Sequence, residues 1–467
     1  MTPGKSENME DERRSFMERL LFRKVELWFV GLLVTVMLGL TVLFGAVVRN
    51  QLLGHDKFGA AGVVALKVAE IPSTIRKMTK QKDRMTAVDG GVRFFGRSGW
   101  SAPGDTTGLD GYLLLSRVDG DADQQHIELV DLRNFEIVHT WNPDANDLFA
   151  DIPICAYCSE KISNKTFRPV HPLVFQNGDL LVKNHNSPLA RIDVCSRKVW
   201  VNPTIFHHSN NIDENGDIWS PGYLSEPEAK ANKSRGEGYY NEAIYKISPE
   251  GETLAKFDLT KILERSGYKY LLAGMNEDYH ADPLHLNDVQ PVMKDGKFWK
   301  AGDIFLSMRN KSTVALFRPS AGKIVWLKSG PWIVQHDVDI ISDSQIYIFD
   351  NHLHPDVVKT HPNDFNRIAV YDFSKDSVNY LWQDKFKKYE IKTDTEGLYD
   401  LLPNGYVMIE ETNFGRIVIF SSDGVLAAEY INGGSDGRSY MLNWSRYVSR
   451  VLGDKVKNAA KSAACGN

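Results

Sequence analysis

The sequence predicts an all-β fold, a six-bladed β-propeller preceded by a single N-terminal transmembrane helix. Three observations predict it: one long uncharged apolar run near the start, short strand-like runs between turn signals over most of the remainder, and an internal repeat of those runs. Repeated units of four short antiparallel strands are typical of propellers, in which radial repetition leaves few exposed sheet edges. A β-sandwich, the main alternative, rarely carries a repeat of this length.

The apolar run extends from residue 27 to residue 48 without a charged side chain. It is long enough to cross a bilayer as one helix, and it starts too late and runs too long for a cleaved signal peptide. More basic residues precede it than closely follow it, which predicts a cytoplasmic N-terminus and a periplasmic or other extracytoplasmic propeller in a single-pass inner (cell) membrane protein. Those before are Arg13, Arg14, Arg19, Arg23 and Lys24, and those after are Arg49, Lys57 and Lys67.

The chain therefore divides into five predicted segments. A cytoplasmic segment over residues 1–26 precedes the transmembrane helix over 27–48. A juxtamembrane linker or helix, broken at Pro72, follows over 49–90. The propeller is expected over 91–442, and a short basic helical tail over 443–467.

Composition excludes a disordered chain and a nucleic-acid binder. The 467 residues are 42% hydrophobic and 25% charged, with a net charge of -5 and no basic face to neutralise phosphates. The cysteines, Cys155, Cys158, Cys195 and Cys465, are too few to hold a fold of this size. Cys155 and Cys158 are expected to form a local disulfide or to be inert thiols rather than a metal or haem site.

Each repeat opens with an apolar strand, a tight turn and a second strand. Three plain copies begin at Val170, His207 and Gly397, and their Asn-Gly turns supply the positive φ angles that a two-residue hairpin requires. Looser copies begin at His285 and His336. Two further strands follow each hairpin, and an opening copy near Tyr112 completes the predicted set of six four-stranded units.

Aligning the repeats on the first strand brings three histidines to one equivalent position. The aligned residues are Val170, His208, His285, His336 and Gly397. The innermost strand of every blade lines the central channel, so equivalent positions face one another around the axis. A lone histidine is usually a satisfied structural residue, but three at one depth indicate a functional cluster.

An arginine and an asparagine are predicted to join these histidines. A hairpin turn near Lys297 pairs His285 with Arg309, and Asn287 lies two residues after His285 on the same strand face. Three imidazoles alone would suit zinc, but a permanent guanidinium repels a cation and offers forked donors to an oxyanion. The cluster therefore favours an anionic ligand, and no metal or other cofactor is expected.

Four segments of the repeats resemble the bacterial arylsulfotransferase family: HHSNNIDENGDIW, HLNDVQPV followed by AGDIFLSMRN, QHDVDIISDSQIYIFDN and LLPNGYVMIEETNFGRI. The resemblance extends from about Gly99 to Ile431, and its most specific element is His-x-Asn followed by a strand ending in Arg-Asn. It implies transfer of a sulfuryl group from an aryl sulfate to a phenol through a sulfohistidine, without a nucleotide donor.

Carried over to this sequence, the resemblance makes His336 the nucleophile and His208 and His285 the other active-site histidines. Asn287 and Arg309 match the residues around the sulfate. Family members have a hydroxyl-bearing residue near the position of Gly397, and Thr395 is the candidate to replace it on the substrate-binding side.

Two readings of function remain open. As an enzyme, the chain would act on aryl sulfates and phenols, with Arg309 keeping His336 neutral and with His285 or His208 exchanging a proton with the aryl oxygen. As a non-catalytic propeller tethered to the membrane, it would bind an anionic ligand or scaffold a protein complex. A protein partner or a homo-oligomer is compatible with either reading.

Overall fold

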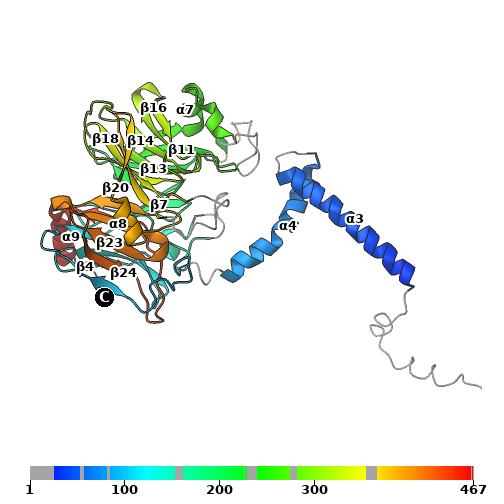
Figure 1. The fold of residues 1–467 in the computed structure, drawn as a ribbon, viewed down its shortest axis with the longest axis horizontal. Helices are drawn as coiled ribbons and strands as arrows, with labels where there is room; N and C mark the ends of the chain where they lie inside the picture. Colours follow the sequence, from blue (N-terminus) through cyan, green and yellow to red (C-terminus); the bar gives the residue numbers. More distant parts are fainter. Residues whose placement is uncertain are drawn as a thin grey trace, which may run out of the picture. The chain divides into compact units, whose positions relative to one another are not determined.

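The computed structural model describes residues 26–52, 57–80, 85–152, 161–225, 227–228, 239–273, 281–353, 365–463 and 465. The chain divides into two compact units, Met1–Thr79 and Lys80–Asn467. The first unit contributes helices and the second contains every described strand (Figure 1).

The first unit contains the apolar helix α3 (Leu27–Leu52), in which none of the residues is buried. Within the described ranges, α3 alone is long and apolar enough to cross a membrane, and a signal sequence near an N-terminus passes the same test. A second helix, α4 (Gly59–Lys80), continues through Pro72, so the predicted break at that proline is wrong. The structure therefore provides one N-terminal apolar helix.

The second unit is a β-propeller, which confirms that part of the predicted fold class. Its sheets are built from strands that follow one another in the chain and pair antiparallel, so neighbouring strands need only short turns. Two four-stranded sheets illustrate this: β13 (Leu286–Pro291), β14 (Ile304–Met308), β15 (Thr313–Arg318) and β16 (Lys323–Ser329), then β17 (His336–Ile340), β18 (Gln345–Asp350), β19 (Arg367–Asp372) and β20 (Ser377–Leu381).

Two further sheets join the beginning of the second unit to its end. In one, β1 (Gly99–Ser101) pairs with β24 (Leu426–Ile431), beside β23 (Arg416–Phe420), β22 (Val407–Glu411) and β21 (Leu398–Leu401). In the other, β25 (Arg446–Val448) pairs with β2 (Tyr112–Asp119), beside β3 (Gln124–Asp131) and β4 (Glu136–Trp141). The ring is thus closed by strands from both ends of the unit, because β1 covers one edge of β24 and β25 covers one edge of β2.

The remaining sheet has eight strands and divides into two halves. One half holds β5 (Leu173–Val174), β6 (Leu180–Val182), β7 (Ser187–Ile192) and β8 (Lys198–Phe206). The other holds β9 (Asn211–Ile212), β10 (Ile218–Tyr223), β11 (Glu242–Ile247) and β12 (Thr253–Asp258). A single register pair, Phe206 with Gly222, joins β8 to β10.

Apolar side chains from adjacent sheets form the core between them. Phe305 and Leu316 of one sheet, for example, are fully buried in one cluster with Ile346 and Ala369 of the next. Short helices connect or cover the sheets: α5 (Ala145–Leu148), α7 (Leu259–Arg265), η2 (Lys269–Leu272), η3 (Arg309–Lys311), η4 (Pro319–Ala321), α8 (Gln383–Lys388), η5 (Pro403–Gly405) and η6 (Thr412–Phe414).

The C-terminal segment differs from the helical tail expected from residue 443. It first forms β25 and only then the helix α9 (Arg450–Ser462), which Figure 1 shows in red beside β4. Val456 of α9 packs in one buried cluster with Ile127 of β3. The tail therefore belongs to the packed structure of the second unit.

A disulfide joins Cys195 to Cys465 across 270 residues of sequence, with their Cα atoms 5.3 Å apart. It fastens the end of the chain to the turn between β7 and β8. No sequence pattern predicts this pairing. Cys155 and Cys158 lie outside the described residues.

Candidate active site

The three predicted histidines lie where inner strands of the sheets begin. His336 is the first residue of β17, His285 immediately precedes β13, and His208 lies shortly before β9. The ring centroids of His208 and His285 are 4.7 Å apart, and those of His208 and His336 are 6.4 Å apart. The repeat register thus brings these rings together as the alignment predicts.

His336 is buried, with 1% of its surface exposed, and both ring nitrogens are engaged. Nδ1 lies 2.7 Å from Oδ1 of Asn351, and the backbone N–H of Glu396 donates to Nε2 at 3.2 Å. The Asn351 amide nitrogen donates to two carbonyl oxygens, so its own oxygen must be the acceptor. The proton of neutral His336 therefore sits on Nδ1, and the lone pair is on Nε2.

His285 is paired with a carboxylate. Its Nδ1 lies 2.5 Å from Oδ2 of Asp282, and 28% of its side chain is exposed. The backbone N–H of Arg309 donates to the carbonyl oxygen of His285, as the predicted hairpin pairing requires. The carboxylate fixes the ring orientation and leaves Nε2 of His285 available to a ligand.

Arg309 is half-buried, and its Nε has no hydrogen-bond partner among the described residues. One other guanidinium nitrogen donates to Asn310 Oδ1 at 2.9 Å. A buried donor without a hydrogen bond costs free energy, so a bound anion that accepts from Arg309 Nε would be favourable. Its charge also reaches His336, because after burial it is the next largest cause that lowers the pKa of that imidazole.

Asn287 does not donate into the cluster in the manner expected. Its side-chain nitrogen donates to the carbonyl oxygen of Gln335 at 2.8 Å, and its buried Oδ1 has no hydrogen-bond partner in the described part of the chain. The residue stands at a bulge between β13 and β14, where the register shifts between Leu286 and Asp288. It therefore fixes the backbone that immediately precedes His336.

Thr395 and Gly397 are not placed beside the histidine rings by any described contact. The Thr395 hydroxyl is bonded to the side chain of Asn413. Gly397 has φ +84°, and a Cβ there would come within 2.4 Å of Thr393 and 2.6 Å of Phe349. A side chain larger than that of glycine does not fit at this position.

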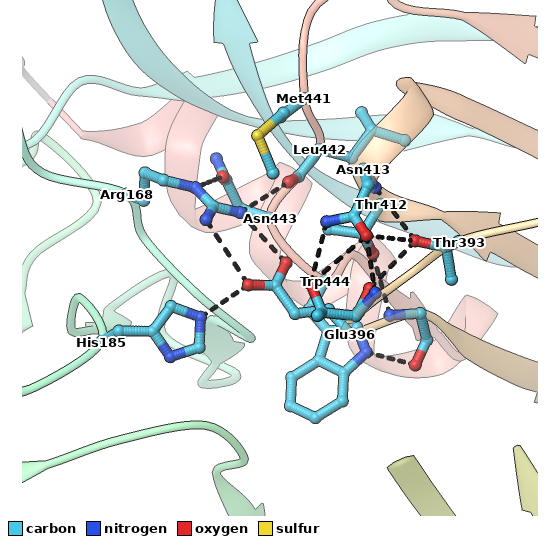
Figure 2. A network of polar contacts seen from close by, with 12 residues as sticks. Arg168, His185, Thr393, Glu396, Thr412, Asn413, Met441, Leu442, Asn443 and Trp444 are labelled. Carbon is cyan, nitrogen blue, oxygen red and sulfur yellow. Dashed lines mark hydrogen bonds and ion pairs between the residues drawn. The ribbon is translucent and has the colours of Figure 1, made fainter. Parts of the chain in front are cut away.

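Sequence reasoning missed the residues that surround His336 on the other side. Figure 2 shows Glu396 at their centre: its carboxylate accepts from Arg168 at 3.1 Å and pairs with His185 Nε2 at 2.7 Å. The Trp444 indole N–H donates to the carbonyl oxygen of Gly397 at 2.6 Å, and its ring lies 6.0 Å from that of His336. None of these residues stands at the aligned repeat position, so the alignment gave no signal for them.

Five rings form what we call the imidazole cluster: His185, His207, His208, His285 and His336. His185 and His208 have centroids 4.7 Å apart, and Nδ1 of His207 lies 2.9 Å from Nδ1 of His208. Burial is the main cause that holds the pKa values of His207, His208 and His336 well below the usual histidine range. These rings are neutral at neutral pH.

A second group of titratable side chains, the carboxyl cluster, lies further along the same inner strands and comprises Asp288, Asp337, Asp339 and Asp400. Burial raises the pKa of Asp288 and of Asp400 to about 6 and that of Asp339 to about 8. The nearby cation is Arg446, which donates to the carbonyl oxygens of Pro172 and Asn210 and lies 2.7 Å from His171 Nε2.

Comparison with known proteins identifies the family. The family model for arylsulfotransferase (ASST) matches residues 174–433, which contain all the inner strands that carry His208, His285 and His336. The chain belongs to the arylsulfotransferase family. No curated protein matches the chain.

Solved structures similar to this arylsulfotransferase-family chain match at low identity. The WD40 β-propeller domain of Doa1 is 12% identical, with a TM-score of 0.37, over 75% of this chain and 96% of that one. The RRP9 WD40 repeats are 9% identical, with a TM-score of 0.32, over 55% and 62%. A catalytically inactive virginiamycin B lyase from Staphylococcus aureus, with quinupristin, is 11% identical, with a TM-score of 0.32, over 57% and 71%.

Proposed function

We propose that the chain transfers a sulfuryl group from an aryl sulfate to a phenolic acceptor through a sulfohistidine at His336. The observation that carries this proposal is the meeting of His208, His285 and His336 beside the unsatisfied guanidinium of Arg309, in a chain of the arylsulfotransferase family. A neutral imidazole supplies the nucleophile, and the guanidinium supplies charge for the sulfuryl oxygens.

In the first half-reaction, Nε2 of His336 attacks sulfur and the S–O bond to the aryl group breaks. The electron pair of that bond leaves on the aryl oxygen, and the sulfuryl group remains on Nε2. Since Glu396 N–H donates to Nε2 at rest, this contact must be exchanged for the bond to sulfur. The proton on Nδ1 stays hydrogen-bonded to Asn351 Oδ1, so the lone pair of Nε2 is the one that forms the bond to sulfur.

In the second half-reaction, a phenol attacks sulfur, the N–S bond breaks and the electron pair returns to Nε2. The phenol must lose its proton to a base. Of the two histidines predicted for this task, His285 fits better than His208, because its ring has a carboxylate partner and is more exposed. Asn287 takes a positioning role through Gln335, and Thr395 is assigned to the rim of the acceptor side.

We also propose that α3 anchors the protein as a single transmembrane helix over residues 27–48, with segment 1–26 cytoplasmic and the propeller periplasmic. The Cys195–Cys465 disulfide supports an oxidising compartment for the second unit. The segment after the helix, over 49–90, would link the anchor to the propeller at 91–442 and its tail at 443–467. The two halves of the eight-stranded sheet are joined by the register pair Phe206 with Gly222 alone. This supports counting the halves as two blades, and the propeller as six-bladed.

One observation favours a second candidate function, a tethered non-catalytic propeller that binds an anion or scaffolds a complex. His336 is 1% exposed and its Nε2 is already occupied by a backbone N–H. In this alternative the histidines and Arg309 hold a sulfate-like group or a protein partner without covalent chemistry.

Full-length protein in detergent, given a chromogenic aryl sulfate and a phenol, separates the two functions. We expect phenol-dependent release of the chromophore and one added sulfuryl group on the peptide containing His336, detected by mass spectrometry after quenching. His336→Asn should lose both signals, whereas His126→Gln on β3 should keep them. A sulfuryl group on another histidine would refute the assignment, and silence of the parent protein would favour the binding function.

A further inference from the structure

His185 is a second imidazole of the cluster that has its own carboxylate. Its Nε2 lies 2.7 Å from Oε1 of Glu396, and the pKa of Glu396 is held well below its usual range by Arg168 and His185 in spite of burial. An ionised carboxylate can only accept, so the proton of neutral His185 sits on Nε2. Nδ1 therefore carries a free lone pair, which is the requirement for a base.

The position of His185 suits a ligand better than that of His208. A quarter of its side chain, 25%, is exposed, whereas His208 as a residue is 8% exposed and is bonded to His207. Burial lowers the pKa of His185, while Glu396 opposes that shift. The ring is thus neutral at neutral pH and ready to take a proton.

Glu396 ties His185 directly to the proposed nucleophile. One residue supplies the carboxylate bonded to His185 and the backbone N–H bonded to Nε2 of His336. Its φ of 58° is strained for a non-glycine residue, and the two bonds from Arg168 and the bond from His185 hold it there. His285, by contrast, pairs through its backbone with Arg309, on the side proposed for the sulfuryl oxygens.

We propose that His185, in place of His285, is the catalytic residue that exchanges a proton with the aryl oxygen, with Glu396 as its positioning residue. This assignment rests on the proposed sulfuryl transfer. When the acceptor phenol attacks sulfur, its proton moves to Nδ1 of His185, the N–S bond breaks and its electron pair returns to His336. The proton on His185 then passes to solvent or, in the reverse direction, to the departing aryl oxygen.

Two half-reactions measured in the full-length protein test the assignment. Rapid quenching with a nitrophenyl sulfate measures the first, because that leaving group departs without a proton. Turnover with a series of phenols of rising pKa measures the second, because only the less acidic phenols need a base. We expect His185→Gln to keep the initial burst within about threefold and to slow transfer to weakly acidic phenols by about 100-fold.

The transfer rate of His185→Gln should approach that of the parent protein as the acceptor phenols become more acidic. A variant that is merely misfolded would not show this dependence on phenol acidity. Glu396→Gln should show the same dependence on phenol acidity with a smaller loss, and His126→Gln should show none. Equal losses for all phenols, or no loss in His185→Gln, would overturn the role of His185 and leave the sulfohistidine mechanism standing. Absence of a burst and of modified His336 in the parent protein would overturn both.

Discussion

The imidazole cluster and the carboxyl cluster occupy the same inner strands but respond to burial in opposite senses. His285 is followed by Asp288 along β13, and His336 by Asp337 and Asp339 along β17. Burial lowers the pKa of His336 and raises the pKa of Asp339 to about 8. In both cases the low-dielectric surroundings disfavour the charged form.

The consequence for function differs between the two clusters. Neutralising an imidazole produces a lone pair, so burial prepares the nucleophile and the bases that the proposed reaction needs. Neutralising a carboxyl group produces only a protonated acid, whose retention costs stability at neutral pH. Burial therefore favours the proposed chemistry in the imidazole cluster, where the strands begin. In the carboxyl cluster, further along the same strands, burial lowers stability, and the positive charge of Arg446 offsets part of that cost.

The largest expected effect follows from removing the positive charge of Arg446 from beside the carboxyl cluster. Arg446→Met would take away the cation beside the carboxyl cluster and leave the carbonyl oxygens of Pro172 and Asn210 without their donor. We expect the free energy of unfolding to fall by about 3–5 kcal/mol, since the buried carboxyl cluster loses the positive charge of Arg446. Urea denaturation followed by tryptophan fluorescence measures the change.

Arg197→Met is the matched control. Arg197 pairs with Asp193 at 2.9 Å, but 69% of its side chain is exposed, so its loss should cost less than about 1 kcal/mol. Equal destabilisation by the two variants would show that Arg446 does not compensate the carboxyl cluster.

Arg309→Met should have the next largest effect, and on activity rather than stability. Loss of one charged donor to the sulfuryl oxygens should lower the rate of the burst by about 100-fold. Burial and then the Arg309 charge lower the pKa of His336, so removing Arg309 raises that pKa. The acid limb of the pH profile of the burst, where His336 becomes protonated, should therefore move to higher pH.

Lys311→Met provides a cation control from the same turn, because its ammonium donates to the carbonyl oxygen of Ala273. It should leave both the rate and the acid limb in place. If the acid limb of the pH profile of the burst does not move in Arg309→Met, the Arg309 guanidinium does not hold His336 neutral.

The sequence was sufficient for the parts of the site that follow from a repeat. Equivalent positions on successive inner strands predicted the meeting of His208, His285 and His336, and the hairpin length predicted the backbone pairing of Arg309 with His285. The β-propeller follows from the same regularity.

The remaining contacts depend on packing between segments that have no common register. Glu396 meets His185 across 211 positions and Arg168 across 228, and Cys195 meets Cys465 across 270. Asn287 was placed on the correct strand, but a bulge turned its amide onto Gln335. Local sequence patterns do not encode such bulges or long-range pairs. The pairing of His185 with the Glu396 carboxylate is therefore visible only in the three-dimensional structure.

The last prediction is a change in the pH dependence of stability in Asp339→Asn. The pKa of Asp339 rises from its ordinary 3.8 to about 8 in the folded protein, so its stability contribution is complete below the unfolded pKa and is lost as pH rises through the folded one. The asparagine cannot titrate. The variant should therefore gain stability relative to the parent between pH 4 and pH 8, measured as urea midpoints. Asp343→Asn, where Lys297 lowers the carboxyl pKa, should not gain. A constant difference at every pH would place the titration elsewhere in the carboxyl cluster.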